Sequence, residues 1–170
     1  VQLDTPYDLA SVTKPFTALA ARRLARRGQI DLARPVGELW PRLAARRVSA
    51  CPLAWLLRHR AGLEAHRELF APLREGRSVS LDAALDEAAD ARLESAPDPA
   101  RGHPVVYSDL GYILAGAVLE QAAGEPLEAI VRREVLLPLA SGAGSARQLR
   151  GRDASFAARV APTEDVAYRG

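Results

Sequence analysis

The chain contains 170 residues, of which 48% are hydrophobic and 26% are charged, and this composition is typical of one folded domain rather than of a disordered chain. Its 23 basic residues are balanced by 21 acidic ones, and the resulting net charge of +2 argues against a nucleic-acid-binding protein. One cysteine excludes an internal disulfide, and no apolar run reaches the roughly 18 residues that a membrane helix needs.

Helices dominate the predicted structure, because apolar residues recur at helical spacing along most of the chain. In chain order, the expected helices cover residues 11–27, 53–60, 81–93, 110–123 and 127–137. Gly28 and Gly62 follow the first two helices, at the place where a residue in the left-handed conformation commonly ends a helix. Ser80 is the expected N-cap of the third helix.

The segments between these helices contain few strand signals. Residues 96–104 hold three prolines and a glycine and are predicted to form a loop, and residues 105–107 are a short β-type run. Residues 142–152 have the small and polar composition of a surface loop. No repeat or long linker divides the chain, so we expect a single folding unit, a partial domain over residues 1–170.

Other classes of site find little support in the sequence. The three histidines, His59, His66 and His103, lack the spacing of metal ligands, so we expect neither a metal nor another cofactor. The chain opens on Val-Gln-Leu-Asp, shows no signal-peptide pattern and contains no Met, which favours a piece of a longer protein. The compartment, cytoplasmic or periplasmic and extracellular, and the oligomeric state stay open.

The most informative pair of residues is Ser11 and Lys14, which stand on one face of the first helix where it begins. Lys14 is the only lysine among the 23 basic residues. An arginine stays protonated in proteins, whereas a desolvated lysine can lose its proton, so only lysine can act as a base here. No other side chain in residues 9–21 is charged, so we expect the first half of the helix to be buried and the pKa of Lys14 to be lowered.

This pair predicts nucleophilic chemistry, in which Lys14 takes the proton of Ser11, Ser11 receives an acyl group, and N–H groups at the helix N-terminus stabilise the oxyanion. A plainer alternative makes Ser11 a helix cap and Lys14 an ordinary helical residue. Further along the same helix, a run of arginines is interpreted as a solvated face rather than a phosphate site. These arginines are Arg22, Arg23, Arg26 and Arg27.

Leu-Ala-Ser-Val-Thr-Lys-Pro-Phe-Thr, at residues 9–17, resembles the Ser-x-x-Lys motif of the serine β-lactamase-related hydrolases, which include class C β-lactamases, DD-peptidases and related esterases. Three more blocks follow in the family's order. Gly-Gln-Ile-Asp-Leu at residues 28–32 resembles the stretch after the nucleophile helix, and residues 56–63 resemble the block Leu-Leu-x-His-x-x-Gly-Leu. Tyr-Ser-Asp at residues 107–109 stands where the family has Tyr-x-Asn.

The resemblance implies the mainly α segment of an α/β fold of the β-lactamase and transpeptidase type, without most of the antiparallel sheet. It also implies a serine hydrolase that forms an acyl-enzyme with a small-molecule or peptide substrate through an ester, amide or β-lactam bond. Tyr107 is carried over as the phenol that shares proton transfer with Lys14 and protonates the leaving group. The alternative for Tyr107 is a buried aromatic residue with a satisfied hydroxyl.

Asp109 departs from the family's Asn, because an ionised carboxylate only accepts hydrogen bonds whereas an amide also donates them. This difference favours esterase or peptidase-like activity over β-lactamase activity. Asp109 has two candidate roles, which are contact with the substrate and capping of the helix over residues 110–123. His59 and Arg60 are interpreted as structural, since their block lies at a helix end.

The family's third motif, Lys-Thr-Gly or His-x-Gly, does not occur in the chain, and neither do the strands that precede the nucleophile helix. Two readings therefore compete. In the first, the chain is part of a hydrolase and is itself almost inactive; in the second, it is a truncated and catalytically silent helical module for binding or scaffolding.

Overall fold

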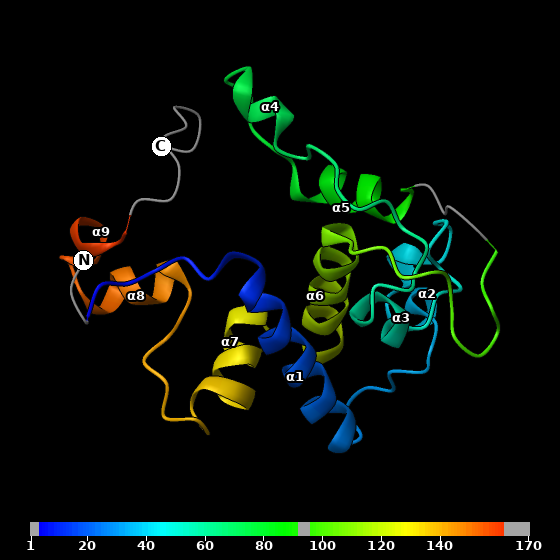
Figure 1. Cartoon of the computed structure of the whole chain (residues 1–170), viewed down its shortest axis with the longest axis horizontal. Helices are drawn as coiled ribbons and strands as arrows, with labels where there is room; N and C mark the ends of the chain where they lie inside the picture. Colours follow the sequence, from blue (N-terminus) through cyan, green and yellow to red (C-terminus); the bar gives the residue numbers. More distant parts are fainter. Residues whose placement is uncertain (1–3, 92–95, 162–170) are drawn as a thin grey trace.

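The computed structural model describes residues 4–91 and 96–161, and within these ranges the chain is helical (Figure 1). Only isolated β-bridges form there, between Pro35 and Pro52 and between Asp98 and Gly102. The helices are η1 (Ala10–Val12), α1 (Thr13–Arg26), α2 (Val36–Leu39), η2 (Pro41–Leu43), α3 (Leu53–Leu57), α4 (Ala71–Arg74), α5 (Leu81–Ala89), α6 (Asp109–Ala123), α7 (Leu127–Val131), η3 (Arg132–Leu136), α8 (Ala146–Arg152) and α9 (Phe156–Arg159). No described helix is long and apolar enough to cross a membrane.

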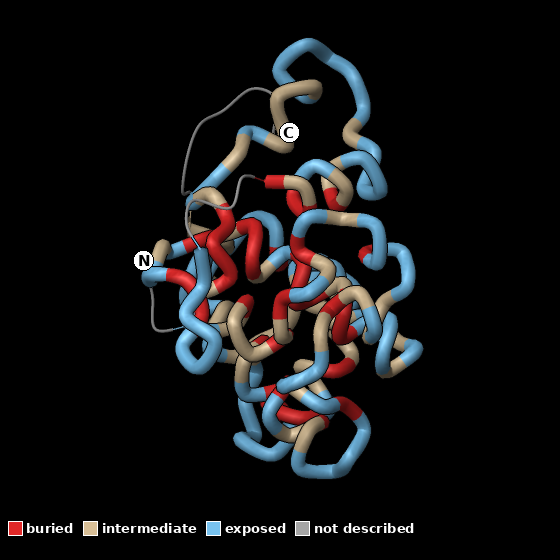
Figure 2. Tube along the Cα trace, turned by 90° about the vertical axis from the view of Figure 1, so that its right-hand side faces the viewer, coloured by how far each residue is buried: buried red, intermediate tan, exposed pale blue. Residues whose placement is uncertain are grey.

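Helix α6 lies in the middle of the helical body and contacts α1, α2, α3, α5 and α7, as Figure 1 shows. Its sequence is apolar on nearly every side, and Leu110, Leu114, Val118 and Leu119 have no exposed surface. Burying large apolar side chains of this kind contributes about 1.5–3 kcal/mol each. Figure 2 shows buried residues in the interior of the body, and α6 is the element against which α1, α2, α3, α5 and α7 pack.

Most predicted helices are present, with differences at their ends. The segment over 53–60 is helical only to Leu57, because His59 turns into the left-handed conformation at φ +58°. Ser80 caps α5 as predicted by accepting a hydrogen bond from the Ala83 N–H at 3.3 Å. Helix α5 ends at Ala89, and residues 92 and 93 of the predicted helix lie outside the described residues.

Two local predictions are wrong. Residues 142–152 are not entirely loop, because Ser145 caps helix α8 by accepting a hydrogen bond from the Gln148 N–H at 3.2 Å. Residues 105–107, the short β-type run, form no strand with any described segment. A short β-type run forms a strand only where a partner edge lies beside it, and composition alone does not supply that partner.

The first half of α1 is not buried as expected. The buried residues of the whole helix, Thr17, Ala20, Ala21 and Leu24, form one stripe along it, whereas Val12, directly before α1, is 59% exposed. Helix α1 packs against its neighbours on one side only, and its start stays open to solvent on the other.

The arginines of α1 are more than a solvated face. Glu134 of η3 has no exposed side-chain surface, and its carboxylate is contacted at 2.9 Å by Arg27, directly after α1, and at 3.4 Å by Arg23 of α1. Arg133 adds a third contact at 2.9 Å. Because an unpaired buried carboxylate would be very costly, Arg23 and Arg27 link the end of α1 to η3 through Glu134.

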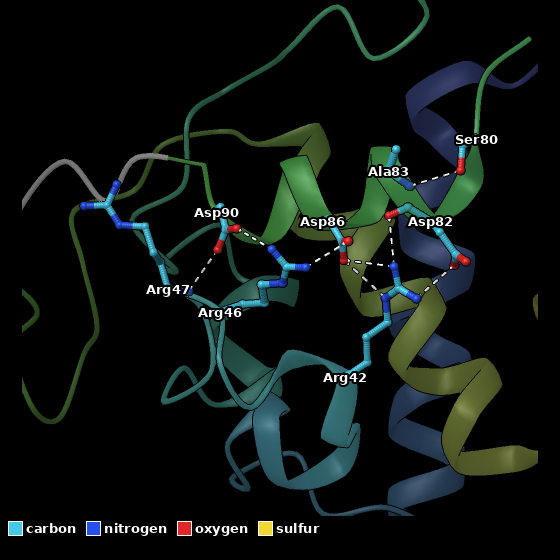
Figure 3. A network of polar contacts seen from close by, with 8 residues as sticks. All are labelled: Arg42, Arg46, Arg47, Ser80, Asp82, Ala83, Asp86 and Asp90. Atoms are coloured by element: carbon cyan, nitrogen blue, oxygen red, sulfur yellow. Dashed lines mark hydrogen bonds and ion pairs between the residues drawn. The ribbon is translucent and has the colours of Figure 1, made fainter.

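A second charged network ties α5 to the segment around η2 (Figure 3). Arg42 contacts Asp82 at 3.1 Å and Asp86 at 3.0 Å. Arg46 contacts Asp86 at 2.8 Å and Asp90 at 2.7 Å. The three aspartates recur every four residues, two in α5 and Asp90 directly after it, so they lie on one side and meet both arginines together.

Candidate active site

Ser11 lies in the 3-10 turn that leads into α1. Ala10, directly before it, has φ +44°, a conformation that is uncommon for residues other than glycine. The side chain of Asp8 holds this turn by accepting a hydrogen bond from the Ala10 N–H at 2.8 Å. Ser11 is not the N-cap of η1 or α1, so the interpretation of Ser11 as a simple helix cap is wrong.

Lys14 reaches back one turn to Ser11. Its Nζ donates a hydrogen bond to Ser11 Oγ at 2.9 Å, as the spacing of three residues predicts. The side chain of Lys14 is only 13% exposed. The two residues of the motif are therefore in direct contact at the open end of α1.

Asp109 is the second partner of Lys14, with Oδ1 at 2.6 Å from Nζ. Burial by itself lowers the pKa of Lys14, but hydrogen bonds and negative charge from Asp109 and Tyr107 outweigh it, so the pKa lies above its ordinary value. The expectation of a lowered lysine pKa is thus wrong. The uncharged stretch around Lys14 in the sequence does not reveal a carboxylate that comes from a distant helix.

Asp109 is also not the cap of α6. Ser108 is the N-cap, since its hydroxyl accepts a hydrogen bond from the Gly111 N–H at 3.2 Å. Ser108 also donates to the carbonyl of Glu64 at 2.7 Å, and the Asp109 N–H donates to the carbonyl of Ala65 at 2.9 Å. These bonds fix the start of α6 and turn the Asp109 carboxylate toward Lys14. The pKa of Asp109 is lowered, chiefly by its hydrogen bond with Lys14.

Tyr107 lies over the Ser11–Lys14 pair. The Lys14 Nζ is 4.9 Å from the centre of its ring. Hydrogen bonds with Ser11 and then with Lys14 lower the pKa of the Tyr107 phenol. The residue is 53% exposed, so the alternative of a buried structural aromatic is wrong.

Two residues near the pair were not singled out from the sequence. The Tyr112 ring lies 5.8 Å from Lys14 Nζ, and its hydroxyl donates to the carbonyl of Leu57 at 2.9 Å. His66 Nδ1 lies 3.5 Å from the second carboxylate oxygen of Asp109. Tyr112 follows Tyr107 by five residues in the same sequence block, which is the one signal that could have indicated it.

A groove of about 600 Å³ opens beside Lys14 and Asp109. Its walls are largely apolar and include Leu69, Phe70 and Ile113. A pocket with apolar walls and a few polar groups at one end is the usual form of a site for a small organic molecule. Among the described residues, no three His, Cys, Asp or Glu side chains gather as metal ligands.

Comparison with known proteins places this arrangement in a family. A sequence model of the family described as Beta-lactamase matches residues 1–167. Over 147 residues the chain is 40% identical to Esterase EstB of Burkholderia gladioli, and this stretch covers 80% of the chain and 37% of that esterase.

Two solved structures share the fold. The D-amino acid amidase from Ochrobactrum anthropi SV3, complexed with L-phenylalanine amide, is 26% identical with a TM-score of 0.65, over 82% of this chain and 38% of that one. The class C beta lactamase from Rhodobacter sphaeroides is 20% identical with a TM-score of 0.62, over 82% of this chain and 36% of that one.

The described helices are therefore the mainly α segment of an α/β fold, the fold of β-lactamases and transpeptidases. The chain belongs to the beta-lactamase family, since the family's model matches nearly all of it. It spans between 28% and 37% of the length of three curated relatives that it matches.

Proposed function

We propose that the protein is a serine hydrolase that works through an acyl-enzyme on Ser11. The observation that carries this proposal is the contact of the Ser11 hydroxyl with a lysine that lies against a tyrosine ring. Ser11 Oγ accepts a hydrogen bond from Lys14 Nζ at 2.9 Å, and Lys14 Nζ lies 4.9 Å from the centre of the Tyr107 ring. A serine becomes a nucleophile only when an adjacent group can take its proton, and this site supplies such a group.

The direction of the hydrogen bonds favours Tyr107 as the group that takes the proton. Asp109 raises the pKa of Lys14 and so keeps it a cation, and a cationic lysine donates to Ser11 rather than accepting from it. The Ser11 proton is then left for Tyr107, whose pKa is lowered. Lys14 keeps a catalytic role as the charge that stabilises the Tyr107 phenolate, since the two groups titrate as a pair.

The proposed reaction starts with attack of Ser11 Oγ on a carbonyl carbon while its proton passes to Tyr107. The carbonyl electrons move to oxygen, and the oxyanion lies near the N–H groups at the start of α1. When the oxyanion collapses, the bond to the leaving group breaks and the leaving group takes the proton from Tyr107. Water then releases the acyl group from Ser11 by the same steps in reverse order.

Ester or amide substrates are favoured over β-lactams. An ionised Asp109 cannot donate a hydrogen bond to a substrate carbonyl, whereas the Asn of the β-lactamase pattern can. The chain's 40% identity to an esterase over 147 residues supports the same preference. We propose esterase or peptidase-like activity for the full natural gene product, with the apolar groove beside Lys14 as the place for the acyl side chain.

A fluorophosphonate probe, followed by peptide mapping, tests the nucleophile in the full natural gene product. Wild type should be labelled on Ser11, and Ser11→Ala should lose the label. Ser78→Ala is the matched control, because Ser78 is an exposed serine outside the site and its loss should leave labelling unchanged. Label that persists in Ser11→Ala would refute the proposal.

The 170 residues alone are expected to show little or no turnover, because the described part of the chain holds no strand that could supply a second oxyanion donor. Ester hydrolysis by the isolated chain at a rate near that of the full gene product would contradict this expectation.

A further inference from the structure

His59 holds the segment that carries Tyr107. The residue follows α3 with φ +58°, in the left-handed region that His, Asn and Asp adopt more readily than most residues. Its carbonyl accepts a hydrogen bond from the Val106 N–H at 3.1 Å. Its ring Nδ1 accepts another from the Ser108 N–H at 3.1 Å. One residue therefore fixes the backbone on both sides of Tyr107.

The imidazole ring of His59 also contacts the phenol ring itself. The centres of the His59 and Tyr107 rings are 4.5 Å apart, with 31° between their planes. Tyr112 contacts the same imidazole at 5.2 Å. Tyr107 is 53% exposed, so this stacking and the two backbone bonds are the main described contacts that place its ring over Ser11 and Lys14.

We propose that neutral His59 is the positioning residue for Tyr107, and that protonation of His59 switches the site off in mildly acidic solution. This inference rests on the proposed function, in which Tyr107 takes the proton of Ser11. A neutral imidazole can accept the Ser108 N–H at Nδ1 only if its proton is on Nε2. A protonated ring has a hydrogen on both nitrogens, so it faces the Ser108 N–H with another donor and the bond is lost.

The groups that face His59 decide where this switch lies. These groups are Lys14 of α1, Asp109 and Tyr112 of α6, and Tyr107 of the segment before α6. Burial and then the positive charge of Lys14 lower the pKa of His59 below its ordinary value of 6.5, while Asp109 opposes them. The fold thus favours the neutral ring. The positioning of Tyr107 by His59 is complete above pH 6.5 and is lost as the pH falls through the lowered pKa of His59.

The sequence places His59 in the block Leu-Leu-Arg-His-Arg-Ala-Gly-Leu, where it was interpreted as structural. In the structure His59 does have a structural role, because it holds the backbone beside Tyr107. Through Tyr107, the proposed proton acceptor, the same residue is connected to proton transfer. The neighbouring cations Arg58 and Arg60 belong to the same turn, and Arg60 donates to the carbonyl of His103 at 3.2 Å.

Two variants of His59 separate the effect of its hydrogen-bond acceptor from the effect of its protonation. His59→Ala removes the ring and its acceptor, and the rate of fluorophosphonate labelling should fall about 100-fold, as expected for misplacing a reacting group by an ångström. His59→Asn keeps a side-chain acceptor and tolerates the left-handed backbone, so it should recover most of that loss at pH 8. Asn does not titrate, so its labelling rate should not show the loss below pH 6.5 that wild type shows.

His66→Asn is the matched control, because His66 is the other histidine beside the site and is exposed. This variant should keep the acid step of wild type. Circular dichroism at each pH checks that all variants stay folded. If wild type is not labelled at all, the proposed function fails; if wild type is labelled and His59→Asn keeps the acid step, or His59→Ala labels as fast as wild type, the role of His59 is refuted alone.

Discussion

Two of the regions that contain ion pairs use different cations. At the open end of α1, the only lysine pairs with Asp109 at 2.6 Å and contacts Ser11 at 2.9 Å. Along α5, Arg42 and Arg46 join three aspartates that follow one another at four-residue intervals (Figure 3). The α5 network contacts no residue of the candidate site among the described residues.

The difference follows from what each cation can do. Arginine offers several fixed donors and does not lose its proton, which suits a permanent link between two helices. Lysine is a compact charge that can take part in proton transfer when its surroundings change. In a chain whose other basic residues are all arginine, the lysine marks the place where proton chemistry is proposed, and the arginines mark where elements are joined.

The largest expected effect comes from exchanging the cation at the site. Lys14→Arg keeps the positive charge but cannot fit its guanidinium between Ser11 and Asp109 in the same geometry, so the cation no longer holds Ser11 and Tyr107 in place for proton transfer. We expect the rate of fluorophosphonate labelling to fall about 1000-fold, within the range that general acid–base groups contribute. Labelling within tenfold of wild type would show that only the charge of Lys14 matters.

A substitution of Glu134 tests the ion pairs of the arginines at the most buried carboxylate that they contact. Burial by itself raises the pKa of this carboxyl, but Arg133, Arg27 and Arg23 outweigh it, and the pKa lies below its ordinary value of 4.5. Arg23 and Arg27 are 40% and 51% exposed and can be solvated when the carboxylate is gone. Glu134→Gln should therefore lower the free energy of unfolding by about 2 kcal/mol rather than by the full cost of a stranded buried charge.

Urea unfolding at several pH values measures this effect. Because the pKa of Glu134 is depressed by folding, its stabilising contribution is complete above pH 4.5 and is lost as the pH falls. The gap between wild type and Glu134→Gln should narrow toward pH 3. Glu75→Gln, at an exposed pair with Arg77, is the control that should change little. An equal gap at pH 7 and pH 3 would contradict the charged role of Glu134.

The contrast between the two regions also explains how far the sequence could predict them. The helices and the Ser11–Lys14 contact depend on residues a few positions apart, and local spacing determines them. The contact of Lys14 with Asp109 joins residues 95 positions apart, and no periodicity encodes it. The pKa of Lys14 was therefore expected in the wrong direction, although the sequence spacing did predict its contact with Ser11.

The same limit applies to Ser108 and His59. The boundary of α6 was predicted within one residue, but which of Ser108 and Asp109 caps it depends on the segment at Glu64 and Ala65. The left-handed conformation of His59 likewise depends on the segment before α6 packed against it, and only the left-handed Gly62 nearby was readable from its residue type.

Asp109→Asn sharpens the comparison by removing the negative charge while keeping an acceptor for Lys14. The new amide can also donate to a substrate carbonyl, and one such bond is worth about 0.5–1.5 kcal/mol. The ratio of penicillin acylation to fluorophosphonate labelling should rise by about 3- to 10-fold. The matched variant Asp31→Asn, in the loop after α1, should leave the ratio unchanged, and an unchanged ratio in Asp109→Asn would remove Asp109 from substrate selection.

The smallest effect is expected where arginine is exchanged for lysine in the α5 network. Arg42→Lys keeps the charge facing Asp82 and Asp86 but loses the fork that reaches both carboxylates and the Asp82 carbonyl. Because the Arg42 side chain is partly exposed and its pairs are screened by water, the free energy of unfolding should fall by only about 0.5 kcal/mol in urea titrations. Labelling of Ser11 should not change. A loss as large as that of Glu134→Gln would mean that the geometry of Arg42 stabilises the fold far more than solvent-screened ion pairs do. The difference between the lysine of the candidate site and the arginines that link helices would then depend on side-chain geometry rather than on burial.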